Sequence, residues 1–379
     1  MEYKEYELGE LLSYEQPTPY IVESTDYNDA YETPVLTAGK SFILGYTDEK
    51  EGIYDQLPVI IFDDFTTASQ YVNFKFKVKS SAMKILTPVT ELVLPKYIYY
   101  RMQIINFDHS THKRYWIQQY SKIRVSVPPL SEQERIVSRI EELFSQLDAG
   151  VETLKKTKAQ LAVYRQAVLK EAFEGDYPRK QLKEFSKAIS GFAFKSSRYS
   201  PDGNYVVVKI GNVKERHFDF SRDLTKTLEA DDSILEKYLL RRGDCLITLT
   251  GSRGKRDYGF VAMVGNQNNY LLNQRVAALR FDQSVALPEF FQYYLASPSY
   301  RDMFFGYETG NVGQGNVGIK ALLDPYVILP DIDTQKRIVE DVEDRLSVCD
   351  SIEQTVDIAL QQAEAMRQSI LKDAFEGRL

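Results

Sequence analysis

Apolar residues recur every seven positions along residues 130–176, and a second stretch, residues 330–379, carries a similar stripe. In the first stretch the stripe consists of Ile140, Leu147, Leu154, Leu161 and Val168, with Ile136, Leu143 and Tyr164 at companion positions. In the second stretch it consists of Ile338, Val342, Ile352, Val356, Ala359, Ala363, Met366 and Ile370, with the small Cys349 also on it and Arg345 interrupting it. A seven-residue apolar repeat is typical of coiled-coil helices. We therefore predict two long helices that pack through these stripes.

The two helical stretches also repeat each other in sequence. Their starts read QERIV from Gln133 and QKRIV from Gln335, and their ends read VLKEAFEG and ILKDAFEG. Each stretch follows a segment of the size of one domain, which is about 100 to 200 residues. We therefore predict a duplication of domain and helix, with globular domains at 1–129 and 177–329 and coiled-coil helices at 130–176 and 330–379.

Helix length fixes the expected direction of the two helices. At about 1.5 Å per residue each helix is roughly 65 Å long, whereas a compact domain of roughly 150 residues has a radius of gyration of about 15 Å. Such a domain cannot return the chain to the start of the first helix. The second helix is therefore expected to begin near the end of the first and to run antiparallel to it, with one globular domain at each end of the pair.

The globular segments carry the shorter periods of strands. Residues 71–78 alternate apolar and polar side chains, and residues 57–62 and 243–249 are apolar runs, which predicts strands. Residues 95–106 and 288–296 predict short helices. The expected fold class is α+β, with two α/β domains of mainly β character, two long antiparallel coiled-coil helices and an internal pseudo-twofold repeat.

The composition of the chain indicates its expected cellular location and the kinds of partner that it can bind. With 43% hydrophobic residues the 379-residue chain can bury two cores, and no apolar run reaches the length of a membrane span. Residues 1–10 are acidic, which argues against a signal peptide, and Cys245 and Cys349 lie far apart, which predicts no disulfide framework and a cytoplasmic location. The net charge of −7 argues against a nonspecific nucleic-acid binder, whose domain would be basic, but leaves a specific one open.

A basic, glycine-containing loop follows the apolar run 243–249. Its polar members are Ser252, Arg253, Lys255 and Arg256. Arginine forks bind guanine or phosphate, and glycines let backbone amides approach a sugar-phosphate chain. The same composition also suits a solvated loop without function. We interpret it as a candidate DNA-binding loop.

The corresponding loop of the first domain, after residues 57–62, is uncharged. Its hydrogen-bonding residues are Thr66, Thr67 and Ser69. This difference fits two equivalent loops that read different sequences. Two further clusters combine basic and aromatic residues, namely Lys113, Arg114 and Tyr115 in the first domain and Lys195, Arg198 and Tyr199 in the second.

The glycine-rich segment 310–318 is a further binding candidate. A phosphate-binding loop needs a strand before it and a helix immediately after it, whereas a helix is expected before this segment. Its amide side chains belong to Asn311, Gln314 and Asn316. Because Asn and Gln amides are suited to adenine, contact with base edges is the preferred interpretation over a nucleotide site.

Neither of two possible metal-binding patterns is complete. His109 and His112 have an HxxH spacing, but no third His or Cys lies nearby in the sequence. Asp63 and Asp64 lack the partner carboxylate and lysine of a nuclease site. We interpret the histidines as part of a polar loop and the aspartates as a solvated turn, and we predict no metal site.

These sequences resemble the specificity subunit of type I restriction-modification systems. The resemblance covers the whole chain and is carried by PPLSEQERIV at 128–137, by its echo LPDIDTQKRIV at 329–339, which departs from it at 331–334, and by the endings of both heptad helices. It implies two target recognition domains that each read one half of a bipartite double-stranded DNA target. The helices would set the spacer between the halves.

The resemblance also implies the partners and where catalysis lies. Methyltransferase subunits would dock on the helices, and restriction-translocase subunits would join the assembly, with no membrane involved. This chain would have no catalytic residues or cofactor of its own, while S-adenosylmethionine, ATP and Mg²⁺ would act in the partner subunits. Target bases would be flipped into partner active sites.

Two alternatives belong to other functional classes. One is a fused methyltransferase or nuclease specificity chain, which would bind S-adenosylmethionine or a metal. The other is a coiled-coil scaffold that binds no DNA. Replacing the Arg253–Arg256 loop by alanines would leave DNA retention by such a scaffold unchanged.

Overall fold

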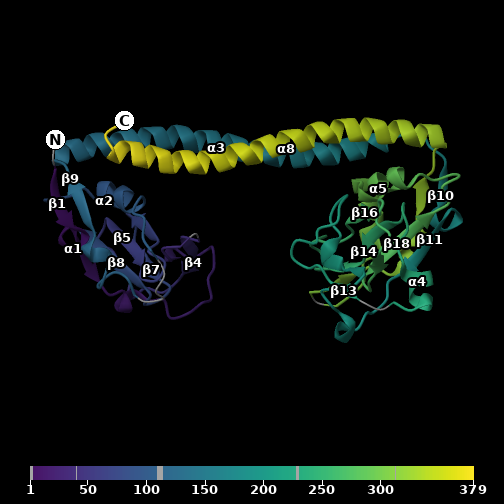
Figure 1. Ribbon diagram of the computed structural model, residues 1–379, viewed down its shortest axis with the longest axis horizontal. Helices are drawn as coiled ribbons and strands as arrows, with labels where there is room; N and C mark the ends of the chain where they lie inside the picture. The colour runs from purple at the N-terminus through teal and green to yellow at the C-terminus, as the bar shows by residue number, and fades with distance from the viewer. Residues whose placement is uncertain (1–2, 40, 109–113, 228–229, 312) are drawn as a thin grey trace. The chain divides into compact units, whose positions relative to one another are not determined.

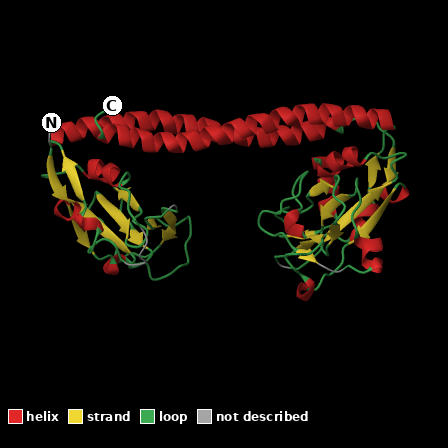
Figure 2. Cartoon of the chain, in the orientation of Figure 1, coloured by secondary structure: helices red, strands yellow, loops and turns green. Residues whose placement is uncertain are grey.

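The computed structural model describes residues 3–39, 41–108, 114–227, 230–311 and 313–379. The chain divides into two compact units, of which unit 1 comprises Met1–Lys155 and Asp357–Leu379 and unit 2 comprises Lys156–Val356. Each unit contains a sheet domain and part of both long helices, α3 (Leu130–Ala172) and α8 (Ile332–Phe375) (Figures 1 and 2). Among the described residues, no helix combines the length and the apolar character needed to cross a membrane.

The sheet domain of unit 1 is built on a four-stranded antiparallel sheet. Its strands lie in the order β2 (Leu12–Glu15), β8 (Met83–Pro88), β5 (Val59–Asp63) and β6 (Ser69–Val72). A three-stranded sheet has the order β4 (Ile43–Thr47), β3 (Thr33–Leu36) and β7 (Lys77–Val78), with β3 parallel to β7. The remaining elements are the pair β1 (Lys4–Glu7) and β9 (Arg124–Val127), the helices α1 (Leu8–Leu11) and α2 (Pro95–Met102), and the 3-10 turns η1 (Thr18–Tyr20) and η2 (Tyr120–Lys122).

The sheet domain of unit 2 repeats this topology. Its four-stranded antiparallel sheet has the order β11 (Ser186–Ser190), β18 (Val276–Phe281), β14 (Cys245–Thr248) and β16 (Val261–Met263). Its three-stranded sheet has the order β13 (Lys226–Thr227), β12 (Tyr205–Val208) and β17 (Tyr270–Leu272), with β12 parallel to β17. The pair β10 (Arg179–Gln181) and β20 (Tyr326–Ile328) matches β1 and β9. The helix α5 (Pro288–Ala296) takes the place of α2.

Unit 2 also contains additional short elements. These are the strand pair β15 (Thr250–Gly251) and β19 (Gly315–Asn316), the helices α4 (Asp232–Tyr238), α6 (Pro298–Gly306) and α7 (Ile319–Leu323), and the 3-10 turns η3 (Leu182–Glu184), η4 (Ser196–Arg198) and η5 (Ile210–Asn212). The predicted α+β class with an internal repeat is confirmed. The alternating run 71–78, predicted as one strand, is instead divided between β6 and β7, which belong to different sheets.

The two long helices pair antiparallel within each unit. In unit 1, Arg135 reaches the backbone oxygen of Leu379, while Asp148, further along α3, pairs with Arg367, which lies earlier in α8. In unit 2 the order is equally reversed, because the ion pairs are Lys158–Glu353, Arg165–Asp350 and Glu171–Arg345 at 3.4, 2.5 and 2.8 Å. The predicted antiparallel pairing is confirmed.

Part of the predicted apolar stripe is wrong, because half-buried charged residues lie where three apolar residues were expected. Ile352, Met366 and Tyr164 are 39%, 53% and 46% exposed. The predicted Val342, Cys349, Val356, Ala363 and Ile370 are buried on the packed face of α8, and Leu346 joins them. On α3 the predicted Ile140, Leu161 and Val168 are buried, and Leu147 and Leu154 are half-buried. Arg165 and Glu353, bonded to each other, take the adjacent places that the prediction gave to Tyr164 and Ile352.

A buried glutamine at the start of each long helix fastens it to the sheet domain. The side chain of Gln133 accepts a hydrogen bond from Leu94 N–H and donates to the backbone oxygens of Leu92 and Pro128. Gln335 makes the same three bonds with Leu287, Val285 and Pro330. Both glutamines are 0% exposed. Leu94 and Leu287 immediately precede the prolines that begin α2 and α5, so each glutamine fixes the entry of a helix.

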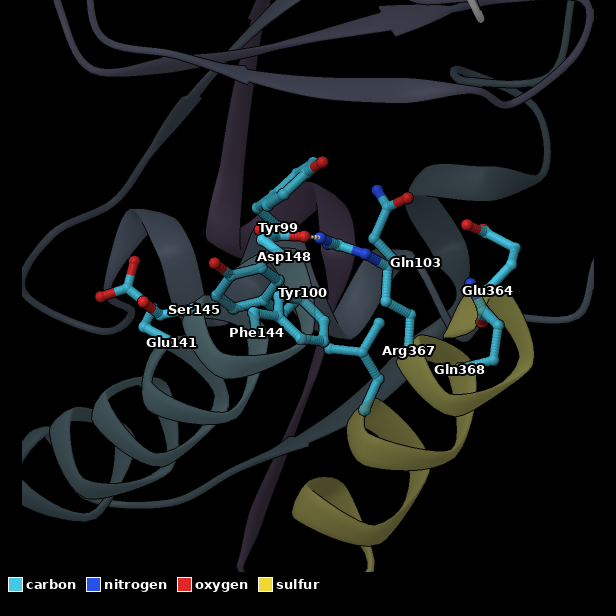
Figure 3. A pocket seen from close by; sticks show the side chains of 11 residues that line it. Tyr99, Tyr100, Gln103, Glu141, Phe144, Ser145, Asp148, Glu364, Arg367 and Gln368 are labelled. Atoms are coloured by element: carbon cyan, nitrogen blue, oxygen red, sulfur yellow. Dashed lines mark hydrogen bonds and ion pairs between the residues drawn. The ribbon is translucent and has the colours of Figure 1, made fainter. Parts of the chain in front are cut away.

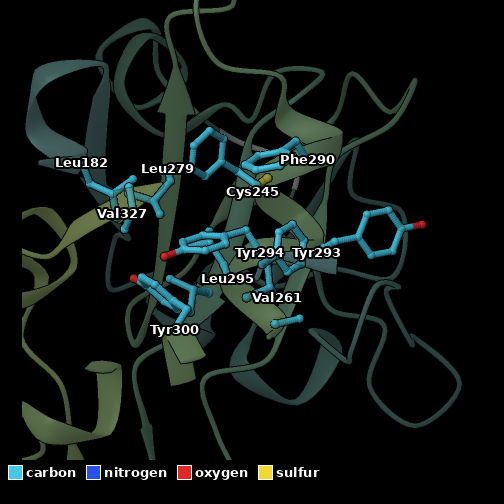
Figure 4. Close-up of a cluster of buried hydrophobic side chains, with 14 of the residues drawn as sticks. Leu182, Cys245, Val261, Leu279, Phe290, Tyr293, Tyr294, Leu295, Tyr300 and Val327 are labelled. Carbon is cyan, nitrogen blue, oxygen red and sulfur yellow. The ribbon is translucent and has the colours of Figure 1, made fainter. Parts of the chain in front are cut away.

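A phenylalanine at the other end of each long helix completes this attachment. Phe375 of α8 packs edge-on against Tyr97 of α2 at 5.2 Å between ring centroids. Phe173, at the end of α3, packs in the same way against Phe290 of α5 at 5.3 Å. Phe173 thereby joins the apolar core of unit 2, in which Phe290, Tyr294 and Tyr300 are buried (Figure 4). Each sheet domain therefore holds the start of one long helix and the end of the other.

Replacing Gln133 by leucine should destabilise unit 1 by on the order of 3 kcal/mol, because it leaves three backbone groups without partners at about 1 to 3 kcal/mol each. Trp116, the only tryptophan, is buried in unit 1, so its fluorescence during urea unfolding measures this loss. Gln146, exposed on the same helix, provides the matched control. Equal midpoints for Gln133→Leu and Gln146→Leu would contradict the role assigned to Gln133.

Candidate nucleic-acid interface

Two of the predicted binding segments of unit 2 lie side by side. Strand β15, at the start of the basic loop, pairs with β19 in the glycine-rich segment. The Arg253 guanidinium donates a hydrogen bond to the backbone oxygen of Gly310 at 2.8 Å. Tyr258 donates a hydrogen bond to the Glu308 carboxylate at 2.7 Å. The two segments thus form one surface, which we call the paired loops of unit 2 (residues 250–260, 308–311 and 313–316).

The polar side chains of the paired loops face solvent. Arg253, Lys255, Arg256, Asn311 and Gln314 are exposed, and Ser252 and Asn316 are half-buried. Arg256 forms an ion pair with Asp302 at 2.6 Å and lies over the ring of Phe305. Hydrogen bonds from Ser252 lower the pKa of Asp257, which keeps this carboxylate charged beside the basic residues. The surface combines cationic and amide groups, as base and phosphate recognition requires.

Close contacts explain two of the glycines in the paired loops, with a backbone atom at Gly310 and with side chains at Gly315. Gly310 has a φ of +128°, and a Cβ atom there would lie 2.1 Å from the backbone oxygen of Gln314. A Cβ atom at Gly315 would lie 2.3 Å from the Glu308 carboxylate. These glycines therefore let the second segment turn tightly and approach β15.

The equivalent loop of unit 1 connects β5 and β6. The Asp63 carboxylate accepts hydrogen bonds from the backbone N–H groups of Phe65 and Thr66, and Thr67 has a φ of +57°. Thr66 is exposed and Thr67 half-buried. Ser69 does not fit the prediction, because it is 7% exposed and its hydroxyl accepts a hydrogen bond from Gln103. Ser69 is therefore a buried residue at the base of the loop and not an exposed binding residue.

The segment around residue 114 joins this loop of unit 1. Arg114 is exposed and lies 6.0 Å from the ring centroid of Phe65. Tyr115 is contrary to the prediction, since it is 1% exposed and packs against Phe107. Its aromatic ring belongs to the core rather than to the surface. The predicted residue Lys113 and the histidine pair His109 and His112 lie outside the described residues.

A buried ion pair lies beneath the loop of unit 1. Asp64 and Lys84 approach to 3.2 Å, and each side chain is 1% exposed. Asp64 also accepts a hydrogen bond from Trp116 N–H at 2.8 Å, and Lys84 donates one to Gln16 at 3.0 Å. The interpretation of Asp63 and Asp64 as a solvated turn is therefore wrong for Asp64. Its carboxylate ties the end of β5 to the segment that follows Arg114.

The basic-aromatic cluster at Lys195 forms a separate surface. Lys195 and Arg198 are exposed, and Tyr199 lies beside Lys209 at 5.2 Å. The backbone oxygen of Arg198 accepts a hydrogen bond from Thr227 of β13. This cluster therefore belongs to the edge of the three-stranded sheet rather than to the paired loops.

Two arginines that the sequence analysis did not select, Arg275 and Arg301, lie next to the paired loops. Arg275 is exposed at the turn between β17 and β18, with a φ of +71°, and its backbone oxygen accepts a hydrogen bond from Leu249 at the base of the paired loops. Arg301 lies on α6 and contacts the basic loop directly. Ser297 followed by Pro298 is a helix-start signal that would have located α6. No sequence signal marks Arg275, because its role depends on backbone conformation.

The long helices present a second kind of surface, a groove in each unit. In unit 1 a groove of about 560 Å³ is lined by Tyr99 and Tyr100 of α2, by Gln103 directly after α2, and by Phe144, Asp148 and Arg367 of the long helices (Figure 3). In unit 2 a groove of about 450 Å³ is lined by Arg165, Asp350 and Glu353 together with Glu215, Arg216 and His217. Arg367 and Arg165 occupy equivalent positions of the repeat, as do Asp148 and Asp350. The grooves are therefore equivalent in the helices and different in the sheet domains.

Among the described residues, no three metal-ligating side chains of His, Cys, Asp or Glu lie together. The two sheet domains share one topology, and each carries polar side chains at the same connection of its four-stranded sheet. The chain belongs to the family of type I restriction modification DNA specificity domains, whose family model matches residues 1–162 and 174–362.

Two curated relatives are specificity subunits of type I restriction enzymes. The EcoR124I/EcoR124II subunit of Escherichia coli is 45% identical over 197 residues, which cover 48% of this chain and 48% of that protein. The EcoKI subunit of Escherichia coli (strain K12) is 29% identical over 279 residues, which cover 69% of this chain and 58% of that protein. The chain thus spans about half the length of the curated relatives that it matches.

Two solved structures share the fold. A chain from a structure on complex assembly and conformational transition of the type I R-M system gives a TM-score of 0.72 at 18% identity, covering 100% of this chain and 98% of that chain. The HsdS subunit from Thermoanaerobacter tengcongensis gives a TM-score of 0.51 at 18% identity, covering 100% of this chain and 97% of that chain. At this identity the likeness concerns the fold.

Replacing Lys84 by methionine should destabilise unit 1 by about 3 to 5 kcal/mol, because it leaves the buried Asp64 carboxylate without its partner charge. The double variant Asp64→Asn, Lys84→Met should lose less, since no charge is then buried and the amide oxygen still accepts from Trp116. Urea unfolding followed by Trp116 fluorescence compares the two. A double variant less stable than Lys84→Met would contradict this assignment.

Proposed function

We propose that this chain is the DNA sequence-specificity subunit of a type I restriction-modification complex. The sheet domain of each unit reads one half of a bipartite double-stranded target. The duplication carries this proposal, because the same sheet connection bears Thr66 and Thr67 in unit 1 and Arg253 and Lys255 in unit 2. Equivalent loops with different hydrogen-bonding groups suit two half-sites of different sequence.

We further propose that the long helices set the spacer between the half-sites and dock two methyltransferase subunits. The grooves beside Arg367 in unit 1 and Arg165 in unit 2 support this, since two equivalent surfaces suit two copies of one partner. Restriction-translocase subunits would join through that assembly. Catalysis, with S-adenosylmethionine, ATP and Mg²⁺, is assigned to the partner subunits, and the complex is assigned to the cytoplasm.

Replacing Arg253, Lys255 and Arg256 by alanine should abolish recognition of one half-site and preserve the other. The physical reason is that unit 1 retains its own loop, whereas unit 2 loses cationic contacts to bases and phosphates. Sequencing of methylated adenines in cells that carry the complete complex shows both half-sites at once.

The matched control removes the same charge elsewhere in unit 2. Lys180, Lys183 and Lys187 are exposed on the segment from β10 to β11, so their triple alanine variant should leave the methylated motif unchanged. Loss of both half-sites in the Arg253 variant, or equal effects of the two triple variants, would count against the proposal.

Deleting one heptad from both long helices, around Leu154 and Val356, should change the spacer and keep both half-sites. Seven helical residues correspond to about 10 Å, which is roughly three base pairs at about 3.4 Å each. Methylation mapping measures the new spacer. A heptad deleted from α3 alone serves as control, because it breaks the pairing register and should prevent assembly. Altered half-sites in the double deletion would refute the spacer role.

A further inference from the structure

We propose that Arg301 is a positioning residue, which holds the basic loop of unit 2 in the conformation that reads DNA and thereby sets the preference of that half-site. The inference rests on the proposed function of the chain. It concerns a side chain outside the paired loops, on the first turn of α6.

Arg301 binds the backbone of the basic loop at three points. Its guanidinium donates hydrogen bonds to the backbone oxygens of Gly259 at 2.8 Å, Arg256 at 3.0 Å and Tyr258 at 3.1 Å. Nη1 and Nη2 are both engaged in these bonds. The guanidinium therefore fixes the path of the loop backbone. The side chains that would contact DNA belong to the loop and not to Arg301.

The helix that carries Arg301 is anchored in the core of unit 2. Tyr300 and Phe304, on either side of Arg301 in the sequence, are 0% and 1% exposed, and Figure 4 shows Tyr300 within the buried cluster of unit 2. Ser297, which is 0% exposed, caps the helix by accepting a hydrogen bond from Tyr300 N–H. The guanidinium also lies over the rings of Phe260 and Phe305 at 5.8 and 5.2 Å. Because its helix is packed in the core and two rings hold its guanidinium, Arg301 occupies a fixed position beside the loop.

The loop needs such support because its backbone is strained at Arg256, which has a φ of +53°. Gly254 and Gly259, at +75° and +73°, adopt positive φ without strain. A left-handed conformation at Arg256 is unfavourable for a residue with a long side chain, and it persists only where neighbouring groups hold it. Arg301 is such a neighbouring group, because it donates a hydrogen bond to the backbone oxygen of Arg256. Without it, the side chains of Arg253 and Lys255 lose their fixed direction.

Two hydrogen bonds connect the basic loop to the glycine-rich segment. Tyr258 lies between two Arg301 contacts and donates its hydroxyl to Glu308, at the start of the glycine-rich segment. Arg253 reaches Gly310 in the same segment. Arg301 therefore positions both of the paired loops, although it contacts the backbone of only one.

Arg301→Lys and Arg301→Met test the proposal in the assembled complex. Lysine keeps the charge but cannot bind three oxygens as a planar fork does. We expect discrimination at the second half-site to fall about 10- to 100-fold, which corresponds to the loss of about one base contact. Discrimination at the first half-site should stay unchanged, because unit 1 keeps its own loop. Competition binding with duplexes altered in either half-site measures each quantity.

Arg280→Lys is the matched control. Arg280 forms a forked ion pair with the buried Asp244 at 2.6 and 2.7 Å, at the opposite end of the four-stranded sheet from the paired loops. Its replacement weakens unit 2 without acting on the paired loops, so half-site discrimination should be kept. Thermal unfolding of every variant shows how far stability alone changes.

The outcomes separate this inference from the proposed function. Loss of discrimination at the second half-site with Arg301→Lys and Arg301→Met, but not with Arg280→Lys, supports positioning. Unchanged discrimination in the Arg301 variants overturns it and leaves the proposed function standing. Equal losses in the Arg301 and Arg280 variants, following their unfolding temperatures, overturn it in favour of a stability role. An unaltered chain that distinguishes neither half-site overturns the proposed function itself.

Discussion

The antiparallel pairing of α3 and α8 is the constraint on which the rest of the structure depends. Because the helices run in opposite directions, each sheet domain is held by the start of one and by the end of the other. Unit 1 combines Gln133 with Phe375, and unit 2 combines Gln335 with Phe173. Neither sheet domain is completed by its own following helix alone. Parts of the chain that are distant in sequence must therefore pair before either unit acquires its full core.

Ion pairs along the border of the packed helix surface give this pairing its register. Arg165 with Asp350, and Arg367 with Asp148, are equivalent ion pairs of the repeat. Polar groups on a coiled-coil seam cost stability but disfavour alternative alignments. A shift by one heptad would move these charges away from their partners. The helices therefore combine an apolar stripe, which provides attraction, with ion pairs that define one alignment.

The sequence was informative where a pattern repeats and less so where tertiary contacts decide. The heptads beginning at Ile140 predicted the long helices, their copied ends predicted the duplication, and the length of the helices predicted their direction. Arg165 was missed because it carries a charge that sequence patterns assign to solvent, although its partners lie on another helix.

The candidate binding surface shows the same limit. Arg253 and Asn311 were identified separately from residue type, but their proximity follows from the pairing of β15 with β19, which a two-residue strand cannot indicate in sequence. The burial of Asp64 depends on Lys84 and Trp116 from distant segments. Whether the exposed residues contact DNA stays a prediction from their chemistry and position.

The glutamine attachments bear on how such a protein can diverge. Gln133 and Gln335 bind only backbone atoms of the sheet domains and of the adjoining prolines, so they place no demand on the side chains at the contacted positions. A sheet domain can exchange most of its surface residues and still fit the same helical frame. Side chains of the sheet domains can therefore change, and new binding preferences can arise, without loss of the attachment. The attachment requires only that the main chain keeps its path at the contacted positions.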